Sequence, residues 1–480
     1  MRFGELFDSA GRLEHIPVEG IFKDSRKMKK NGLFVCLKGT KEDGHQFAAQ
    51  AAENGASVII AQEKISVGVP VVYVEDTAAA LVEVSRRFYK NPARRLKLIG
   101  VTGTNGKTTV THFIKAILEA AGKKVGLIGT NGIFVGNQPL DIERTMPTTP
   151  DALELQEIFA KMCDEQAEYV VMEVSSHAIA QGRIRDLQFV CSVFTNLSRD
   201  HLDYHKTMQA YQATKAKLFS VSDRAVINID DAAGREIAFR CTCPVLTVGV
   251  HDAAITAGAI SLEAHGSRFI AEEGDGRFPI QFCFLGRFNI YNALCAIGAA
   301  RSLGIGYDAI QKGLSGLGGV AGRLEAVGTD GRFSVLIDYA HSPDGLENVL
   351  HTVRGFCRGR IILVFGCGGD RDRTKRPIMG EIAGRLADVS VITSDNPRTE
   401  NPETILAEIC SGMRRARGEY VAIADRKEAI FYALTRARAQ DVVLLAGKGQ
   451  ETYQIVGYEK HHFDEREIVN EWFLKIKIKE

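Results

Sequence analysis

The sequence contains no run of about 18 consecutive apolar residues, the length that a membrane-spanning helix needs. Its beginning, MRFGELFDSA, has no basic stretch followed by an apolar core, as a secretory signal would have. An excess of charge of one sign is also lacking, because 60 Lys and Arg residues stand against 59 Asp and Glu residues. This balance excludes a basic nucleic-acid coat, and a hydrophobic content of 45% excludes a disordered chain. We therefore expect a globular protein of the cytoplasm that binds no nucleic acid and does not span a membrane.

Cysteine pairs of the C-x-x-C type are absent too, although the chain has 10 cysteines. Most of the cysteines lie within apolar runs, which favours reduced core residues over a zinc site or a disulfide framework. Neither interpretation explains the closely spaced pair Cys241 and Cys243.

A length of 480 residues corresponds to about three domains. Short apolar runs alternate with helical patterns from about residue 96 onward, which is typical of parallel sheets with crossover helices. The segments Asn91–Arg95 and Gly316–Gly322 are rich in Pro or Gly and are interpreted as hinges. We predict an α/β protein with a small N-terminal α/β domain (1–92), a central P-loop parallel-sheet domain (93–322) and a C-terminal Rossmann-like domain (323–480).

Ten short apolar runs are predicted strands: Leu98–Val101, Val125–Ile128, Tyr169–Met172, Val190–Phe194, Ala225–Ile229, Val335–Ile337, Ile361–Phe365, Val389–Ile392, Tyr420–Ile423 and Val442–Leu445. Polar or charged residues follow several of these runs directly. Because open parallel sheets bind ligands beyond the carboxyl ends of their strands, we expect the functional residues there.

A glycine-rich segment follows the first of these strands and consists of Gly103, Thr104, Asn105, Gly106, Lys107, Thr108 and Thr109. Apolar residues then recur at helical spacing up to the stop signal Gly122, namely Val110, Phe113, Ile114, Ile117, Leu118 and Ala121. Strand, loop and helix in this order are typical of a phosphate cradle, in which backbone N–H groups and Lys107 bind the anion and a Thr108 or Thr109 hydroxyl reaches Mg²⁺. Val101 stands where the usual motif has Gly, so the loop is a shortened variant. The alternative is a helix-entry turn with an incidental lysine.

Two residues near the ends of later strands are candidate ligands of a divalent cation beside a triphosphate. Glu173 offers a carboxylate and His201 offers an imidazole. His201 is the weaker ligand for Mg²⁺, because this hard cation prefers oxygen. A hydrogen-bonded polar loop is the alternative interpretation.

Eight motifs together resemble the Mur ligase family, in the order GTNGKTT, MEVSSHAIAQGRI, FTNLSRDHLDYH, LGRFNIYNALCA, DYAHSPDGL, FGCGGDRDRTKRPIM, SDNPR and LLAGKGQETYQ. The likeness covers nearly the whole chain, including Asp24–Arg26 and Asp43–Phe47. It implies an ATP-dependent amide ligase of peptidoglycan synthesis that adds meso-2,6-diaminopimelate to the D-glutamyl γ-carboxylate of UDP-N-acetylmuramoyl-L-alanyl-D-glutamate. We expect such an enzyme to be a monomer. The alternatives are a lysine-adding member, a folylpolyglutamate-type ligase or, outside enzymes, a nucleotide-binding regulatory module.

The resemblance also implies a reaction course. The γ-carboxylate attacks the γ-phosphorus of ATP, giving an acyl phosphate and ADP, and the amine of diaminopimelate then displaces phosphate. Lys107 and one or two Mg²⁺ ions would neutralise charge on the transferring group. Because Lys107 and Arg398 lie in different predicted domains, the third domain is expected to close over the second.

In this family a lysine at the position of Lys215 is carbamylated by CO₂. The change suits metal binding, because an ammonium repels Mg²⁺ whereas a carbamate is a carboxylate on a long arm. Lys217 points to another side of a helix. A solvated surface lysine is the alternative. The implied metal ligands are thus Thr108, Glu173, His201 and Lys215 as its carbamate.

Further residues match positions that hold the two larger substrates in similar ligases. The resemblance assigns to ATP the residues Asn289, Asn292, Arg323, Asp338 and His341, with Arg323 at the phosphates and Asp338 at the ribose. For Asn289, a helix N-cap is the alternative. The residues implied for the UDP-linked dipeptide are Ser25, His45 and Gln46 in the uridine pocket, and Thr148, Thr149, Ser175, Gln181 and Arg183 around the sugar and peptide.

Arg398 is the residue that favours diaminopimelate over lysine as the added amino acid. Its planar guanidinium can hold a carboxylate through two hydrogen bonds, and diaminopimelate differs from lysine by one distal carboxylate. The other implied contacts to diaminopimelate are Arg371, Asp395, Asn396, Pro397, Gly447 and Glu451, the last of which would pair with the distal ammonium. A purely structural interpretation of residues 395–403 is a turn followed by a helix, with Asn401 as the N-cap and Pro402 at the first helical position. This interpretation is compatible with amino-acid binding, because the turn would present Arg398.

Overall fold

The computed structural model describes residues 1–480 except 9–10, 40–41, 143–144, 264–265, 328–330 and 478–480. The chain forms two compact units, each made of several segments. The first consists of residues 1–100, 122–192 and 217–224, and the second of residues 101–121, 193–216 and 225–480. A membrane-crossing helix, which needs length and apolarity together, is not found among the residues described.

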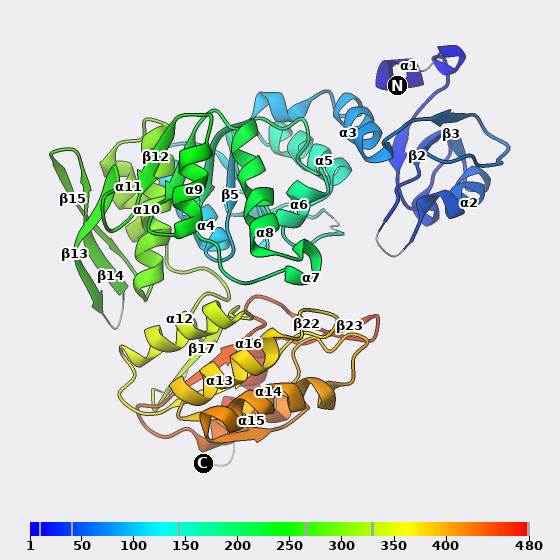
Figure 1. Ribbon diagram of the computed structural model, residues 1–480. Coiled ribbons are helices and arrows are strands. Elements are labelled where there is room, and N and C mark those ends of the chain that lie inside the picture. The colour runs from blue at the N-terminus through cyan, green and yellow to red at the C-terminus, as the bar shows by residue number, and fades with distance from the viewer. Residues whose placement is uncertain (9–10, 40–41, 143–144, 264–265, 328–330, 478–480) are drawn as a thin grey trace. The chain divides into compact units, whose positions relative to one another are not determined.

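The N-terminal part contains a four-stranded parallel sheet with the order β1-β2-β3-β4, shown in blue in Figure 1. Its elements are α1 (Phe3–Leu6), η1 (Gly11–Leu13), β1 (Gly20–Phe22), η2 (Ser25–Lys27), β2 (Gly32–Val35), η3 (Gly44–Phe47), α2 (Ala48–Glu53), β3 (Ala56–Ala61), β4 (Val71–Tyr73) and α3 (Thr77–Phe88). Successive residues of β2 point to opposite faces of the sheet: Leu33 and Val35 pack with α1 and α3, and Phe34 packs with α2. Both faces are therefore buried, as is typical of parallel sheets.

An eleven-stranded sheet has the order β15-β14-β13-β12-β11-β10-β5-β9-β6-β7-β8. Its strands are β5 (Lys97–Thr102), β6 (Val125–Gly129), β7 (Gly132–Val135), β8 (Gln138–Pro139), β9 (Tyr169–Glu173), β10 (Phe189–Phe194), β11 (Ala225–Asn228), β12 (Val245–Val248), β13 (Ile255–Glu263), β14 (Gly266–Glu273) and β15 (Gly276–Phe282). Strand β6 is parallel to β9, and β11 is parallel to β12. Both margins of the sheet are antiparallel, because β6, β7 and β8 form one meander and β13, β14 and β15 form another.

The helices of this middle region are η4 (Pro92–Arg95), α4 (Lys107–Ala120), α5 (Ala152–Asp164), α6 (Ser176–Ala180), α7 (Leu202–His205), α8 (Met208–Ala216), η5 (Lys217–Val221), α9 (Ala232–Arg240), α10 (Arg287–Ser302) and α11 (Tyr307–Gly316). Helix α4 ends as predicted, since Ala121 caps it and Gly122 follows with a left-handed φ of 79°. The predicted apolar face of α4, from Val110 to Leu118, is fully buried.

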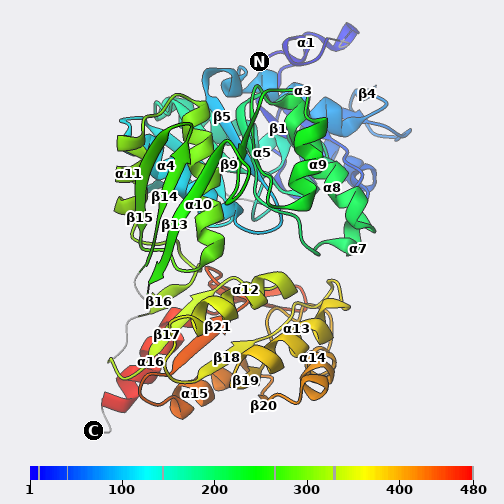
Figure 2. The ribbon, with the colours of Figure 1, turned by 60° about the vertical axis from the view of Figure 1, so that its left-hand side comes forward.

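The C-terminal part is a six-stranded sheet with the order β16-β17-β21-β18-β19-β20, in which only the β16–β17 pair is antiparallel among the described strands. Its elements are β16 (Glu325–Val327), β17 (Ser334–Asp338), α12 (Pro343–Arg354), β18 (Ile361–Phe365), α13 (Lys375–Leu386), β19 (Val389–Ile392), α14 (Pro402–Ala416), β20 (Tyr420–Ala422), α15 (Arg426–Arg436), β21 (Val442–Ala446), the hairpin β22 (Tyr453–Val456) and β23 (Glu459–His462), and α16 (Glu465–Lys477). The strands β17, β21, β18, β19 and β20 lie side by side in Figure 2. Leu363 and Phe365 face α12, α13 and α14, whereas Ile362 and Val364 face α15 and α16. Helices thus cover both faces of a parallel sheet, which is a Rossmann-like arrangement.

The predicted α/β class is confirmed, and each of the ten predicted strands is present with ends that differ by at most one residue. Glu173 and Asp338, expected just beyond two strands, are instead the last residues of β9 and β17. The antiparallel strands β13 to β15 were not predicted. Only one face of this meander is buried, so its residues alternate between buried and exposed and form no continuous apolar run.

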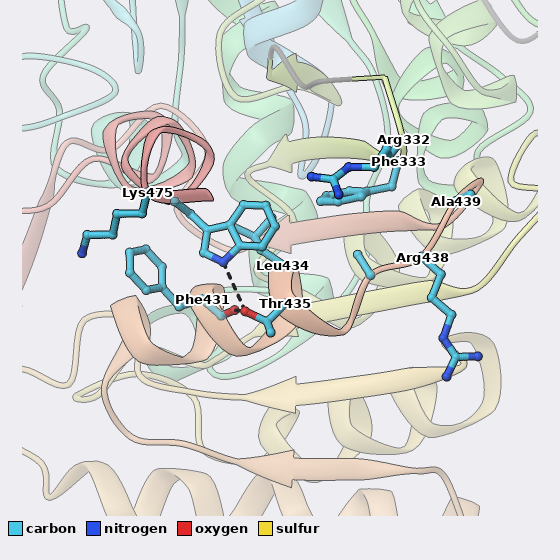
Figure 3. Close-up of a pocket in the computed structure, with 10 residues that line it drawn as sticks. Arg332, Phe333, Phe431, Leu434, Thr435, Arg438, Ala439 and Lys475 are labelled. Atoms are coloured by element: carbon cyan, nitrogen blue, oxygen red, sulfur yellow. Dashed lines mark hydrogen bonds between the residues drawn. The ribbon is translucent and has the colours of Figure 1, made fainter. Parts of the chain in front are cut away.

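A pocket of about 550 Å³ lies in the C-terminal part, at the amino ends of β17 and β21 (Figure 3). Arg332 and Phe333 precede β17, and Arg438 and Ala439 precede β21. Trp472 of α16 lines the same pocket and donates a hydrogen bond to Thr435 of α15 (3.2 Å). The predicted ligand-binding residues follow the opposite, carboxyl ends of the strands, so this pocket is separate from them.

The packing of α16 against the sheet gives a stability prediction. Phe473 is buried and its ring stacks on Phe333, with 5.8 Å between the ring centroids. We expect Phe473→Ala to lower the free energy of unfolding of the C-terminal part by about 3–5 kcal/mol. Urea unfolding followed by the fluorescence of Trp472, the only tryptophan, measures this change.

The matched control is the neighbouring Leu474→Ala. Leu474 is 62% exposed, so its truncation should change the free energy of unfolding by no more than about 0.5 kcal/mol. Equal shifts of the unfolding midpoint in the two variants would contradict the described packing.

Candidate functional site

The glycine-rich segment joins β5 to α4 and leaves no room for larger residues. Gly103 and Gly106 both have positive φ angles, of 149° and 85°. A Cβ on Gly106 would lie 2.3 Å from Oδ1 of Asn292. Lys107 bends back over the loop, where its Nζ donates to the carbonyl oxygens of Gly103 (2.9 Å) and Thr104 (2.8 Å). The loop therefore has the compact backbone and the cation that a phosphate cradle requires.

Polar side chains from β10 and its following loop fix the conformation of this segment. Thr195 Oγ1 donates to the carbonyl of Asn105 (2.6 Å), and Asn196 Oδ1 accepts the N–H of Asn105 (2.9 Å). The Asn105 side chain donates to Asp344 of α12 (2.7 Å).

Asn289 and Asn292 lie within the first two turns of α10 and are both buried. Asn292 Nδ2 donates to Asn289 Oδ1 (2.9 Å), and Asn289 Nδ2 donates to the carbonyl of Leu285 (2.8 Å). The helix N-cap is Gly286, so the N-cap interpretation of Asn289 is wrong. The close approach of Asn292 to Gly106 brings this pair to the phosphate loop.

Arg323 also reaches the phosphate loop. Its Nη2 donates to Oγ1 of Thr108 at 2.8 Å. Asp338 accepts two backbone N–H groups, from Leu324 (2.7 Å) and Ala340 (2.8 Å), and burial raises the pKa of its carboxyl group although Arg323 opposes the rise. Both oxygens of Asp338 keep a further lone pair for a ligand hydroxyl.

His341 follows β17 and lies close to groups of both signs. Its Nδ1 donates to the carbonyl of Tyr339 (2.8 Å), which leaves Nε2 as the acceptor. Burial lowers the pKa of His341, and the nearby ammonium of Lys375 lowers it further.

Lys215 is 1% exposed and lies on α8, so the surface-lysine interpretation is wrong, whereas Lys217 is exposed. The Nζ of Lys215 donates to the carbonyl of Gly103 (2.7 Å) and lies 4.5 Å from the ring centroid of Tyr211. Burial lowers the pKa of this amine well below its ordinary value, and the charge of Lys107 adds to the effect. A buried amine with a lowered pKa is a better nucleophile at neutral pH than an exposed lysine.

Asp200 is a further residue of this region that was not predicted, although it stands directly before His201. Its Oδ2 lies 3.3 Å from Nε2 of His201. Burial alone would raise the pKa of Asp200, but His201, His341 and Lys375 together hold it below the usual range. Within the described residues no group of three or more His, Cys, Asp and Glu side chains is arranged to hold a metal.

Glu173 ends β9 and is buried. Its Oε1 accepts the backbone N–H of Thr130 (2.8 Å), and its Oε2 accepts the hydroxyl of the same residue (3.2 Å). The Thr130 hydroxyl is also 3.1 Å from that of Thr148. These bonds match the polar-loop alternative.

The structure brings the other residues predicted for the sugar and peptide together. Thr149 Oγ1 donates to Ser175 Oγ (3.2 Å), and Ser175 is the N-cap of α6. Arg183 Nη1 donates to the carbonyl of Thr149 (2.8 Å), and Arg183 Nε donates to Gln181 (3.0 Å). One guanidinium, an amide and two hydroxyls therefore form a connected polar surface.

The residues predicted for the uridine pocket lie in the N-terminal part. Ser25 is buried and Gln46 is exposed. His45 uses both ring nitrogens, since Nδ1 donates to Asp43 (2.5 Å) and Nε2 accepts a backbone N–H just after β3 (2.9 Å). The His45 ring is thus held in place by the protein itself.

Arg398 is held in an uncommon backbone conformation, with φ at 50°. Its main chain pairs with the β22–β23 hairpin through Ile455 (3.1 Å) and Gly457 (2.7 Å). Nη1 donates to the carbonyl of Gly369 (2.8 Å). Burial lowers the pKa of the guanidinium, and the charge of Arg371 lowers it further. The two arginines therefore form a cationic site that favours an anionic group.

A group of buried charges lies around the segment that precedes Arg398. Lys448 Nζ donates to Glu451 (3.2 Å) and Asn396 (3.3 Å), and Asn396 Nδ2 donates to Glu451 (2.9 Å). Oδ2 of Asp395 is buried and has no hydrogen-bond partner among the described residues. Burial would raise the pKa of Asp395, but Lys448 and Arg426 lower it, whereas burial and Asp395 raise the pKa of Glu451. An unpaired carboxylate oxygen at this position suits a cationic ligand group.

Arg426 supports this group and has no signal in the sequence. It is buried, and its Nε donates to the buried Glu465 (2.9 Å). Nη1 and Nη2 donate to the carbonyls of Ser394 (3.2 Å) and Ala446 (2.9 Å). The guanidinium thus connects the ends of β19 and β21, directly before Asp395 and Gly447.

The turn-and-helix alternative for residues after Arg398 is also present. Pro397 is buried and its carbonyl accepts the N–H of Glu400 (3.1 Å). Asn401 is the N-cap of α14, accepts the N–H of Glu403 (2.8 Å) and precedes Pro402 at the first helical position. The predicted turn and N-capped helix therefore follow Arg398 directly.

Three family models match consecutive parts of the chain. They are described as the Mur ligase family catalytic domain for residues 17–89, the Mur ligase middle domain for residues 101–300, and the Mur ligase glutamate ligase domain for residues 322–449.

Curated relatives match almost the whole chain. A protein of Caldanaerobacter subterraneus named UDP-N-acetylmuramoyl-L-alanyl-D-glutamate–2,6-diaminopimelate ligase is 47% identical over 461 residues, covering 95% of each chain. A protein of Clostridium acetobutylicum with the same name, numbered 1, is 44% identical over 468 residues, covering 96% of each chain. A solved structure of a ligase of that name has a TM-score of 0.68 and 32% identity, and the match covers 99% of both chains.

The phosphate loop gives a prediction with a matched control. Gly106→Ala would place a Cβ against Asn292, so we expect it to weaken ATP binding at least about tenfold, which is about 1.4 kcal/mol. Gly122 also has a positive φ, but a Cβ at this position would have no atom within 4 Å, so Gly122→Ala should leave ATP binding unchanged. Isothermal titration with ATP measures both variants. Equal affinities would contradict the described loop.

Proposed function

The chain belongs to the Mur ligase family, and we propose that it catalyses the ATP-dependent addition of meso-2,6-diaminopimelate to the D-glutamyl γ-carboxylate of UDP-N-acetylmuramoyl-L-alanyl-D-glutamate. This activity belongs to peptidoglycan synthesis. The observation that carries the choice of substrate is that Arg398 lies near the buried Asp395 and the half-buried Glu451. A cation and two anions in one place suit the distal end of an amino acid that carries both an ammonium and a carboxylate.

The nucleotide end of the site is proposed to consist of the phosphate loop with Arg323, Asn289 and Asn292. Support comes from the contacts of Arg323 with Thr108 and of Asn292 with Gly106. Lys107 forms hydrogen bonds to its own loop, and these can be exchanged for a phosphate oxygen. With Asp338 at the ribose, these groups orient the γ-phosphoryl group for attack by the substrate carboxylate.

Lys215 is proposed to react with CO₂ to form a carbamate, releasing one proton. Only the neutral amine reacts, and its lowered pKa increases the neutral fraction at neutral pH. The product is an anion beside the phosphate loop. Thr108, Glu173 and His201 are the other ligands proposed for Mg²⁺, and His201 is the weaker one because this cation prefers oxygen. Bound Mg²⁺ would supply charge neutralisation for the transferring phosphoryl group.

The UDP-linked dipeptide is proposed to bind Ser25, His45 and Gln46 through its uridine end. Because both nitrogens of His45 are engaged, this residue would contact the ligand through its ring face or its backbone. The sugar and peptide are assigned to Thr148, Thr149, Ser175, Gln181 and Arg183. Hydrogen bonds connect the last four of these residues. The Thr148 hydroxyl instead forms a hydrogen bond with that of Thr130.

The amino acid is proposed to bind Arg398 and Arg371 through its distal carboxylate, and Asp395 and Glu451 through its distal ammonium. Asn396, Pro397 and Gly447 complete the wall of the site. Lysine has the ammonium but not the carboxylate, so it would leave the half-buried guanidinium without an anion. The proposed domains remain 1–92 for the UDP end, 93–322 for ATP and 323–480 for the amino acid.

The central test is ADP release that requires the UDP-linked dipeptide and meso-diaminopimelate together. In competition, we expect meso-diaminopimelate to be preferred to L-lysine. Arg398→Lys should reduce this preference about tenfold to a hundredfold, because a lost charged hydrogen bond costs about 1.5–3 kcal/mol. Arg417→Lys is the matched control, since Arg417 is exposed and has a similar φ of 56°.

The outcomes separate the alternatives. A preference for lysine in the unmodified enzyme would identify a lysine-adding member. Turnover only with a folate and glutamate would identify a folylpolyglutamate-type ligase, and ATP binding without any turnover would identify a regulatory module.

Lys215→Ala should lower the rate at least about a hundredfold, because a ligand of the transition-state charge is removed. Short carboxylic acids should restore part of the rate by taking the place of the carbamate. Lys217→Ala, which changes an exposed lysine, should retain full activity. A fully active Lys215→Ala enzyme would refute the carbamate.

A further inference from the structure

None of the ten cysteines, all of which the structure describes, forms a disulfide. Five of them are buried as predicted: Cys36, Cys191, Cys295, Cys367 and Cys410. Cys241 and Cys243 behave differently. They lie in the turn between α9 and β12, both are half-buried, and their Sγ atoms are 3.4 Å apart. Two thiols are therefore in van der Waals contact at a surface that the proposed reaction does not use.

The local backbone explains this contact. Cys241 ends α9 in an extended conformation, with φ at −67° and ψ at 135°. In an extended segment residues two positions apart point to the same side, so Cys243 follows Cys241 on one face while Thr242 points to solvent. Phe239, two residues earlier, is 90% exposed, so its side chain does not shield the pair from small molecules.

Little movement separates the two thiols from a covalent bond. A disulfide has an S–S distance of about 2.05 Å, so the sulfurs need to approach by about 1.4 Å. The ring would enclose a single intervening residue, which places strain on the bond. Strained and exposed disulfides are reduced readily and are typical of labile rather than permanent bridges.

We propose that Cys241 and Cys243 are a site of reversible oxidation to an intramolecular disulfide by low-molecular-weight disulfides. The thiolate of one cysteine attacks a sulfur of the reagent R–S–S–R, forming a mixed disulfide and releasing one R–SH. The thiolate of the other cysteine then attacks the protein sulfur of the mixed disulfide, forming the Sγ–Sγ bond and releasing the second R–SH. The two cysteines lose two electrons and two protons, which leave with the two released thiols.

Cys283 provides an internal control. It is exposed, and its Sγ donates to the carbonyl of Leu317 (3.1 Å). The same reagent should therefore convert Cys283 to a stable mixed disulfide. Trypsin separates the sites, because the peptide 241–268 contains the proposed pair and no other cysteine, whereas Cys283 lies in the peptide 278–287.

The experiment treats the folded full chain with oxidised glutathione at a concentration that modifies Cys283. Remaining thiols are then alkylated, and the masses of the tryptic peptides are measured by mass spectrometry. We expect the 241–268 peptide to lose two hydrogens and to carry neither glutathione nor alkyl groups. Dithiothreitol should restore two thiols that react with the alkylating agent.

Single-cysteine variants make the test independent of the wild-type result. In Cys241→Ser and in Cys243→Ser the remaining cysteine lacks a resolving thiol, so each peptide should retain one glutathione adduct. Unchanged ligase activity of both variants shows that they are folded. A wild-type peptide with one or two glutathione adducts, or with two free thiols while Cys283 is modified, would overturn the proposal.

Discussion

Charge buried at the carboxyl edge of the C-terminal sheet determines how the side chains of the proposed amino-acid site are arranged. An isolated ion in a protein interior is strongly unfavourable, so each must find a partner. Arg426 is neutralised by Glu465 and also binds the ends of two strands, and Lys448 is shared between Glu451 and Asn396. Asp395 keeps one unpaired oxygen, and Arg398 has only carbonyl partners among its described hydrogen bonds. A ligand with both an ammonium and a carboxylate would supply the partners that Asp395 and Arg398 lack in these bonds.

Buried charge also constrains the phosphate loop, where the charges brought together are both positive. Lys107 and Lys215 both donate to the carbonyl of Gly103, so two amines share one buried acceptor. Burial lowers the pKa of Lys215, and repulsion by Lys107 lowers it further. A triphosphate would balance the charge of Lys107, and the proposed carbamate on Lys215 would remove the repulsion between the two amines. Burial makes the charged form of Lys215 unfavourable, and this supports the proposed reaction with CO₂.

The sequence was most informative where structure is local. Strands such as Ile361–Phe365 are buried on both faces and appear as continuous apolar runs, and the phosphate loop is a contiguous segment between a strand and a helix. The meander β13 to β15 was missed because its alternating burial gives a weak signal.

Local sequence patterns could not identify residues whose partners lie far away along the chain. Arg426 binds Glu465 and Ser394, which lie 39 and 32 residues away, and no local pattern marks such contacts. The buried state of Lys215 also depends on a contact 112 residues away. The motifs that resemble the Mur ligases located the candidate residues, but the charges that surround them became visible only in the fold.

The most direct test of the proposed substrate is a crystal structure of the enzyme with meso-diaminopimelate bound. We expect both oxygens of the distal carboxylate to lie within hydrogen-bond distance of the Arg398 guanidinium, at about 2.7–2.9 Å, and the distal ammonium to contact Asp395 or Glu451. A distal carboxylate bound elsewhere, with Arg398 still directed at the carbonyl of Gly369, would contradict this assignment.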